Sequence, residues 1–178
     1  MTKQELRKIL RSMTPERAVE ESEAVFGKVE ALPSFRMAKS VLLYWSIPSE
    51  LPTHSFIAKW YGKKEIYLPK VAGERLELRR YSPETMVEGY RGIMEPGPEA
   101  ACIEPSKIDF AVIPGLGFDR QCRRLGRGGG FYDRLIPELE CPKVAVSFDC
   151  RIVPEVPVEK WDAAVDMVVT SSEIFLPL

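Results

Sequence analysis

The segment from Asp119 to Arg134 concentrates residues that can bind an anion. It holds five arginines and four glycines, against two acidic side chains. These residues are Arg120, Arg123, Arg124, Arg127 and Arg134, with Gly126, Gly128, Gly129 and Gly130. Glycine permits positive φ and leaves backbone N–H groups uncovered, and successive uncovered amides before a helix form a nest for phosphate. The segment therefore predicts a phosphate-binding loop; a solvated turn of paired surface arginines is the alternative.

The glycine-arginine loop matches neither of two common nucleotide motifs. No Gly-Lys-Ser/Thr triplet follows the glycines, and their spacing is not G-x-G-x-x-G. Asp133 closes the segment, where a carboxylate could hold Mg²⁺ against phosphate oxygens or complement a helix dipole. The residues alone leave these two readings open.

Composition narrows the chemistry that such a loop can serve. The single histidine, His54, argues against histidine-based nucleophilic or metal chemistry. The four cysteines form no C-x-x-C pair and are typical of reduced cytosolic thiols. A net charge of −1 disfavours a nucleic-acid binder. The sequence has no long apolar run and a polar start, which predicts a cytoplasmic protein that neither enters a membrane nor carries a signal peptide.

Alternating helices and strands must position the loop. Thr2 and Glu5 form a capping-box pattern before an apolar stripe through Met13, and Thr14-Pro15 predicts the start of a second helix that Pro33 ends. A third helix is expected from Thr53 to about residue 61, and a fourth from 130 to 138. Strands are expected at 40–45, 65–68, 76–81, 109–114, 143–148 and 165–170, with 82–107 mostly loop. This order predicts one α/β domain over residues 1–178, with a mainly parallel sheet between two helical layers.

Two adjoining motifs identify a family that this chain resembles. They are Val112-Ile-Pro-Gly-Leu-Gly-Phe-Asp119 and Arg124-Leu-Gly-Arg-Gly-Gly-Gly-Phe-Tyr-Asp133. Both resemble the signature of 5-formyltetrahydrofolate cyclo-ligases, and shorter similarities at both ends of the chain extend the resemblance. The resemblance implies a fold like that of ribose-phosphate isomerases and CoA transferases. It implies that ATP phosphorylates the formyl oxygen of 5-formyltetrahydrofolate and that N-10 then closes the ring, releasing phosphate.

The resemblance also assigns nucleotide contacts. By pattern alone, Lys3, Arg7 and Arg11 form a basic stripe that is typical of a solvated helix face. The family match makes the start of that helix and the glycine loop the expected ATP site. Its residues are Lys3, Gln4, Glu5, Leu6, Arg7, Arg124, Leu125, Gly126, Arg127, Gly128, Gly129, Gly130, Phe131 and Tyr132. Arg127 is the expected catalytic residue, because it can neutralise charge that develops on the transferred phosphoryl group.

The loop after the first expected strand resembles the folate-binding part of the family. Expected folate contacts are Arg7, Trp45, Ile47, Glu50, Arg127, Gly128, Gly129, Gly130 and Phe131. Glu50 can accept hydrogen bonds from a pterin. Asp133 and Asp162 resemble the ligands of Mg²⁺.

Two other functions remain as alternatives. One is a sugar-phosphate enzyme on a related fold that uses the anion nest without ATP or Mg²⁺. The other is a folate- or nucleotide-binding relative with an altered substrate. Small-molecule substrates, no nucleic acid, no membrane and a monomeric state are expected in the cyclo-ligase reading.

Overall fold

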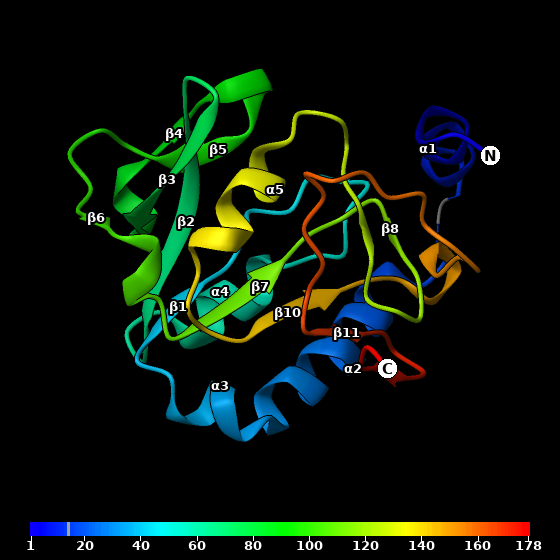
Figure 1. The fold of residues 1–178 in the computed structure, drawn as a ribbon. Helices are drawn as coiled ribbons and strands as arrows, with labels where there is room; N and C mark the ends of the chain where they lie inside the picture. Colours follow the sequence, from blue (N-terminus) through cyan, green and yellow to red (C-terminus); the bar gives the residue numbers. More distant parts are fainter. Residues whose placement is uncertain (14) are drawn as a thin grey trace.

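The computed structural model describes residues 1–13 and 15–178. Figure 1 shows a twisted central sheet with helices against it. The helices are α1 (Lys3–Arg11), α2 (Ala18–Ala31), α3 (Pro33–Met37), α4 (His54–Trp60) and α5 (Phe131–Leu135). The strands are β1 (Ser40–Leu42), β2 (Glu65–Ala72), β3 (Arg75–Arg80), β4 (Met86–Glu88), β5 (Met94–Pro96), β6 (Cys102–Ile103), β7 (Phe110–Ile113), β8 (Gly117–Phe118), β9 (Arg124–Leu125), β10 (Lys143–Val146), β11 (Met167–Val169) and β12 (Ile174–Phe175).

The main sheet is mostly parallel at its centre. Its strand order is β12-β11-β10-β7-β1-β2-β3-β6. The neighbours from β11 through β10, β7 and β1 to β2 are parallel, whereas β12, β3 and β6 pair antiparallel at the edges. Central strands are buried on both faces, which explains why their sequences are continuous apolar runs. The predicted mainly parallel α/β fold is therefore confirmed.

Each face of the sheet carries its own apolar core. On one face, Phe26 of α2, Phe35 of α3 and Phe56 of α4 pack against alternate residues of the central strands. On the other face, Leu135 and Ile136 pack against the intervening residues of the same strands, whose side chains point the opposite way. The sheet thus lies between two helical layers, as the alternating pattern predicts.

Helix α1 stands apart from these layers and begins where the sequence predicts. The Thr2 hydroxyl accepts from the Glu5 N–H, and the Glu5 carboxylate accepts from the Thr2 N–H. Leu6 and Leu10 bury their side chains in a small third core with Leu125. No helix in the described parts of the chain is long and apolar enough to cross a membrane.

Several predicted boundaries are wrong. The second helix begins at Ala18 rather than at Pro15, because residues 16 and 17 form a turn; Thr14 lies outside the described residues. Pro33 does follow the end of α2, but it also opens α3. Thr53 precedes α4 without capping it, since its hydroxyl donates instead to the Tyr44 carbonyl at 2.6 Å.

Short hairpins replace two segments expected as loop. Strands β4 and β5 pair within 82–107, and β8 pairs with β9, which lies inside the predicted phosphate-binding loop 119–134. Each strand is only two or three residues long, too short for a periodic pattern to appear. The expected helix at 130–138 is α5 followed by a 3₁₀ turn at Ile136–Glu138.

Candidate active site

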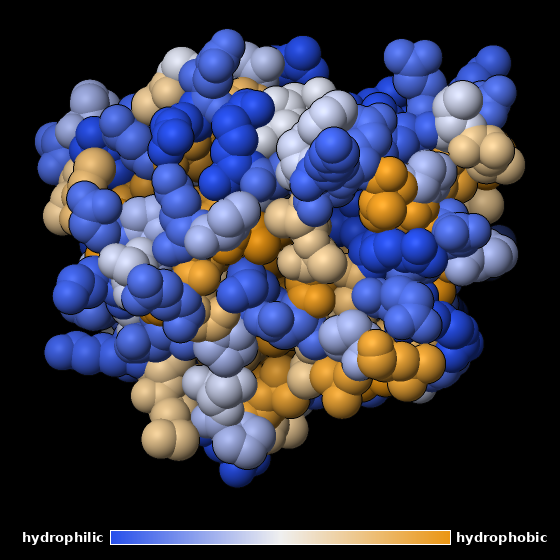
Figure 2. Space-filling view, in the orientation of Figure 1, coloured by the Kyte–Doolittle hydropathy of each residue, from blue (hydrophilic) through white to orange (hydrophobic). Residues whose placement is uncertain are grey.

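A large pocket opens at the carboxyl edge of the parallel strands. Its volume is about 1190 Å³. Tyr44 and Trp45 enter it just after β1, and Pro114 and Gly115 enter it just after β7. Ligands of open parallel sheets bind at this edge. In Figure 2 polar side chains cover most of this view of the surface, with apolar side chains exposed between them.

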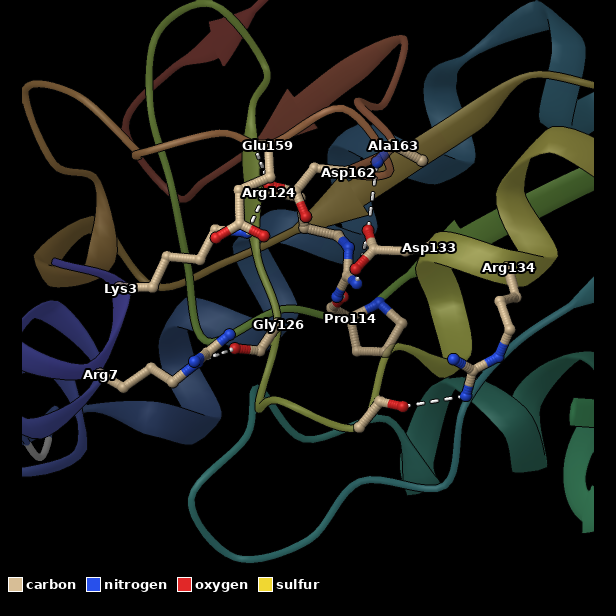
Figure 3. A network of polar contacts seen from close by, with 11 residues as sticks. Lys3, Arg7, Pro114, Arg124, Gly126, Asp133, Arg134, Glu159, Asp162 and Ala163 are labelled. Atoms are coloured by element: carbon tan, nitrogen blue, oxygen red, sulfur yellow. Dashed lines mark hydrogen bonds and ion pairs between the residues drawn. The ribbon is translucent and has the colours of Figure 1, made fainter. Parts of the chain in front are cut away.

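The glycine loop, residues 126–130, forms one wall of the pocket. Its backbone carbonyl groups accept hydrogen bonds from arginines on two helices. Arg7 of α1 donates to the Gly126 carbonyl at 2.8 Å, and Arg11 donates to the Arg127 carbonyl at 3.1 Å. Arg134 of α5 donates to the Gly129 carbonyl at 2.9 Å, as Figure 3 shows, and to that of Glu74 at 2.7 Å. Arginines from two helices therefore fix the path of this loop.

The amides of the same loop remain available. Within residues 1–13 and 15–178, the N–H groups of residues 127–130 donate to no other residue. Gly128 and Gly130 have φ of +114° and +72°, a region that side-chain-bearing residues rarely adopt. In an anion-binding nest the backbone carbonyls point away from the anion and the N–H groups stay free to donate to it, and this loop has both features.

Two aspartates lie next to one another beside the loop. Asp133 accepts from the Ala163 N–H at 3.1 Å, and Ala163 directly follows Asp162 (Figure 3). The Asp162 carboxylate pairs with the Lys3 ammonium and accepts from the Glu159 N–H at 2.7 Å. Lys3 is 16% exposed and Asp162 8% exposed at their side chains, so water screens this pair only partly.

A buried arginine, Arg124, forms an ion pair with Asp133. The side chain of Arg124 is 4% exposed and donates to Asp133 at 3.4 Å and to the Pro114 carbonyl at 3.1 Å. Its Nε–H has no partner among the described residues. Burial lowers the pKa of Arg124, and the neighbouring Asp133 carboxylate opposes that shift.

These carboxylates fit a magnesium ion that also binds phosphate. The described residues contain no cluster of three His, Cys, Asp or Glu side chains that could hold a metal by themselves. Mg²⁺ commonly takes one or two carboxylates and completes its shell with water and substrate phosphates. Asp133 and Asp162 supply oxygen donors of that kind next to the glycine loop.

The loop after β1 forms the wall that faces the glycine loop. Glu50 accepts from the Ile47 N–H at 3.0 Å, and Arg127 lies 3.8 Å from its carboxylate. Arg127 also donates to the Ser49 hydroxyl at 3.1 Å. Burial raises the pKa of Glu50, while the Ile47 N–H and the Arg127 charge oppose the rise. Arg127 thus spans from the nest to the expected folate wall.

An aromatic stack supports the same wall. The Trp45 ring lies 3.9 Å from that of His54, and the Nε2 atom of His54 lies 3.0 Å from the Ser46 carbonyl oxygen. Tyr44 donates through its hydroxyl to the Leu51 carbonyl at 3.0 Å. The loop from residue 44 to residue 54 is therefore closed on itself and held in shape.

The pocket brings together most of the residues expected from the sequence. They are Lys3, Gln4, Arg7, Trp45, Ile47, Glu50, Arg124, Gly126, Arg127, Gly128, Gly129, Gly130, Phe131, Tyr132, Asp133 and Asp162. Three expected ATP contacts do not line it. Glu5 is used in the capping box, and Leu6 and Leu125 are buried in the third core. Their side chains hold α1 and the loop in place.

One wall of the pocket has no signature in the sequence. Tyr90, Ile93 and Met94, around the β4–β5 hairpin, line the pocket. The Tyr90 ring meets the edge of Phe131 at 5.7 Å. A partly buried Glu95–Lys70 ion pair at 2.7 Å ties this hairpin to β2. The glutamate and the lysine are far apart in sequence, so only the fold reveals the wall.

The fold and the pocket together define an α/β protein with an arginine-lined pocket at the carboxyl edge of its sheet. Family comparison is more specific: residues 1–171 match the model of the 5-formyltetrahydrofolate cyclo-ligase family. The chain belongs to this family.

Individual relatives agree with the family match. The 5-formyltetrahydrofolate cyclo-ligase of Escherichia coli K12 is 32% identical, covering 96% of this chain and 98% of that protein. The Haemophilus influenzae enzyme of the same name is also 32% identical, over 89% of each chain. The solved Aquifex aeolicus 5,10-methenyltetrahydrofolate synthetase is 35% identical with a TM-score of 0.89, over 99% of this chain and 93% of that one. These matches confirm the predicted family and the predicted cyclo-ligase function.

Proposed function

We propose that this protein uses ATP to convert 5-formyltetrahydrofolate to 5,10-methenyltetrahydrofolate, with release of ADP and phosphate. The supporting observation is that Arg127 belongs to the free-amide loop and also contacts Ser49 and Glu50 of the opposite wall. A reaction between a nucleotide on one wall and a folate on the other needs such a shared cation.

The proposed reaction has two chemical steps. The formyl oxygen attacks the γ-phosphorus of ATP, and the bond to the ADP oxygen breaks. N-10 then attacks the formyl carbon, loses its proton, and phosphate leaves. Phosphoryl transfer depends mainly on positioning and charge neutralisation. The free amides of residues 127–130, together with Lys3 and Arg7, would hold the phosphates, and Arg127 would stabilise charge on the transferred group and the formyl oxygen.

The loop after β1 would hold the pterin. The Glu50 carboxylate lies in the pocket and can accept from the pterin N–H groups. Trp45 and Ile47 supply apolar contact beside it. Phe131 and the glycines of the loop border the same space, so they would contact folate as well as nucleotide.

Asp133 and Asp162 would hold Mg²⁺ in this site. A magnesium ion held there would supply positive charge that neutralises the phosphates of ATP. The Lys3 ammonium, which pairs with Asp162, would then be free to contact a phosphate. We include Mg²⁺ and ATP in the proposed requirements of the enzyme.

The direct test is an absorbance assay with purified protein. Mixing it with 5-formyltetrahydrofolate, ATP and Mg²⁺ should produce the near-ultraviolet absorbance of the methenyl product. Omission of ATP or Mg²⁺ should abolish the signal. Turnover of the folate without ATP would overturn the proposed mechanism, and ATP binding without turnover would favour the alternative of a binding relative.

Other features of the proposal concern the whole chain. We propose that residues 1–178 act as one catalytic domain and as a monomer. The four cysteines are unpaired, which fits a reducing compartment such as the cytoplasm. The likeness to ribose-phosphate isomerases and CoA transferases stays a prediction about the fold. A sugar-phosphate isomerase would use a carboxylate as a base and would need no Mg²⁺, so Mg²⁺-dependent turnover would favour the cyclo-ligase.

A further inference from the structure

The rim of the pocket carries a tryptophan that the proposed function does not yet use. Trp161 lines the pocket and is 69% exposed. Its ring makes no ring–ring contact with any described residue. The other two tryptophans differ, because Trp45 stacks on His54 and Trp60 meets Phe35 edge to face. Trp161 therefore offers an open aromatic face to the pocket.

The position of Trp161 is fixed by its neighbour. Trp161 directly precedes Asp162, whose carboxylate pairs with Lys3 of α1. Gln4 directly follows Lys3, is exposed, and lines the same pocket. Since this ion pair joins the two segments, Trp161 and Gln4 lie at the end of the pocket where the proposed function places the phosphate-binding lysine.

The surface next to Trp161 is apolar. Pro157 and Val158 also line the pocket, and Val158 is 52% exposed. Single exposed apolar residues are ordinary, but here three line one rim of a pocket that is otherwise rich in cations. A ligand with a flat apolar part and an anionic part would match the rim and the glycine loop together.

From this arrangement we infer that the Trp161 indole is a stacking platform for the purine base of the nucleotide. The inference rests on the proposed ATP site and adds a residue that recognises the base. Every base has a π face, so aromatic stacking secures it without reading its hydrogen-bonding edge. The Gln4 amide can both donate and accept, which suits the amino group and ring nitrogen of adenine.

The test separates base binding from phosphate binding. ATP and inorganic tripolyphosphate share a triphosphate, but only ATP carries a base. In Trp161→Ala the Kd for ATP from calorimetry should rise at least about fivefold, whereas the Kd for tripolyphosphate should stay unchanged. Trp161→Phe should restore most of the ATP affinity. ATP, but not tripolyphosphate, should quench tryptophan fluorescence in the wild type, and the quench should be absent in Trp161→Phe.

Controls make the result specific. Met37→Ala removes an apolar side chain that is 86% exposed on α3 and lies outside the pocket lining, so it should leave both Kd values unchanged. An unchanged Kd for ATP in Trp161→Ala would overturn the inference. Equal weakening of ATP and tripolyphosphate would overturn it too, because the effect would then be on the phosphates. Absence of ATP-dependent turnover in the wild type would instead reject the proposed function.

Discussion

The Lys3 ammonium of helix α1 lies against the Asp162 carboxylate near the other end of the chain. The contact closes one side of the pocket and joins two of its proposed functional groups. It also places a protein cation where a metal ion and phosphates are expected. A salt bridge so little exposed leaves an uncompensated charge behind when one partner is removed.

Lys3→Ala is expected to raise the KM for ATP about 10- to 100-fold, since a charge-assisted contact to phosphate is lost. The KM for 5-formyltetrahydrofolate should change little. Initial rates at varied ATP check this prediction. Lys8→Ala is the matched control, because Lys8 is exposed on the same helix and outside the pocket lining. Equal effects of the two variants would show that only general charge was lost.

Arg127→Ala is expected to lower kcat about 100- to 1000-fold, the usual effect of losing a positioned charge at the transition state. The fold should survive, because within the described residues the side chain of Arg127 has polar contacts only with the Ser49 hydroxyl and the Glu50 carboxylate. Steady-state kinetics with circular dichroism measure both. Arg120→Ala is the control, because this arginine of the same loop pairs with Glu173 and neither residue lines the pocket. Its kcat should stay close to the wild-type value. A kcat near the wild-type value in Arg127→Ala would remove its catalytic role.

Asp133→Asn is expected to shift the Mg²⁺ dependence of turnover to higher concentration. The amide keeps one oxygen for the Ala163 N–H but loses the charge that attracts the cation. A magnesium titration at saturating ATP measures the midpoint. Asp166→Asn is the control, because this aspartate accepts from the Lys143 N–H and does not line the pocket. Overlapping titrations for wild type and Asp133→Asn would exclude Asp133 from the metal site.

Glu50 should make the free energy of unfolding depend on pH. Burial raises its pKa in the native state, so the native protein holds this proton more tightly than the unfolded chain. The resulting stability is present below the ordinary glutamate pKa and is lost as pH rises through the raised value. Glu50→Gln should therefore flatten the dependence of unfolding free energy on pH in urea titrations and raise the KM for folate. Glu23→Gln, an exposed glutamate on α2, should keep the wild-type dependence. Identical pH profiles for wild type and Glu50→Gln would contradict the assignment.

Gly130→Ala should destabilise the protein by about 1–2 kcal/mol, because φ at this position is +72°. The new methyl would also lie 2.8 Å from a guanidinium nitrogen of Arg134. Gly27→Ala provides a control of opposite sign. Gly27 lies inside α2 with open space around it, so alanine should stabilise by about 1 kcal/mol. Thermal unfolding of both variants measures the difference, and a neutral Gly130→Ala would show that the loop adapts.

The sequence predicted what depends on local patterns. The Thr2–Glu5 capping box and the apolar runs of β1, β7, β10 and β11 could be read directly, because caps and doubly buried strands have their own signatures. The predicted start of α2 is too early, because Pro15 fits a first helical turn but residues 16 and 17 form a turn before the helix. The wall formed by β4 and β5 could not be predicted, because it is held by the Glu95–Lys70 pair and by strands too short to show a periodic pattern.

The same distinction between local patterns and long-range contacts applies to the candidate site. The glycine-arginine loop was visible as a motif, and the resemblance supplied Lys3, Glu50 and Asp162. The partners of these side chains were not visible. The Lys3–Asp162 pair and the reach of Arg127 to Ser49 join residues far apart in the chain, and no local pattern encodes such contacts. The exposure of Trp161 at the rim of the pocket likewise needed the structure.

The joining of α1 to residues 159–162 also orders events during synthesis. Lys3 is synthesised well before Asp162, which follows it by 159 residues in the chain. The sheet can begin to assemble earlier, since β1, β2 and β7 all precede residue 120. The pocket is thus closed on this side only after residues 159–162 have been made, so a nascent chain that lacks them has a partial scaffold without a closed site.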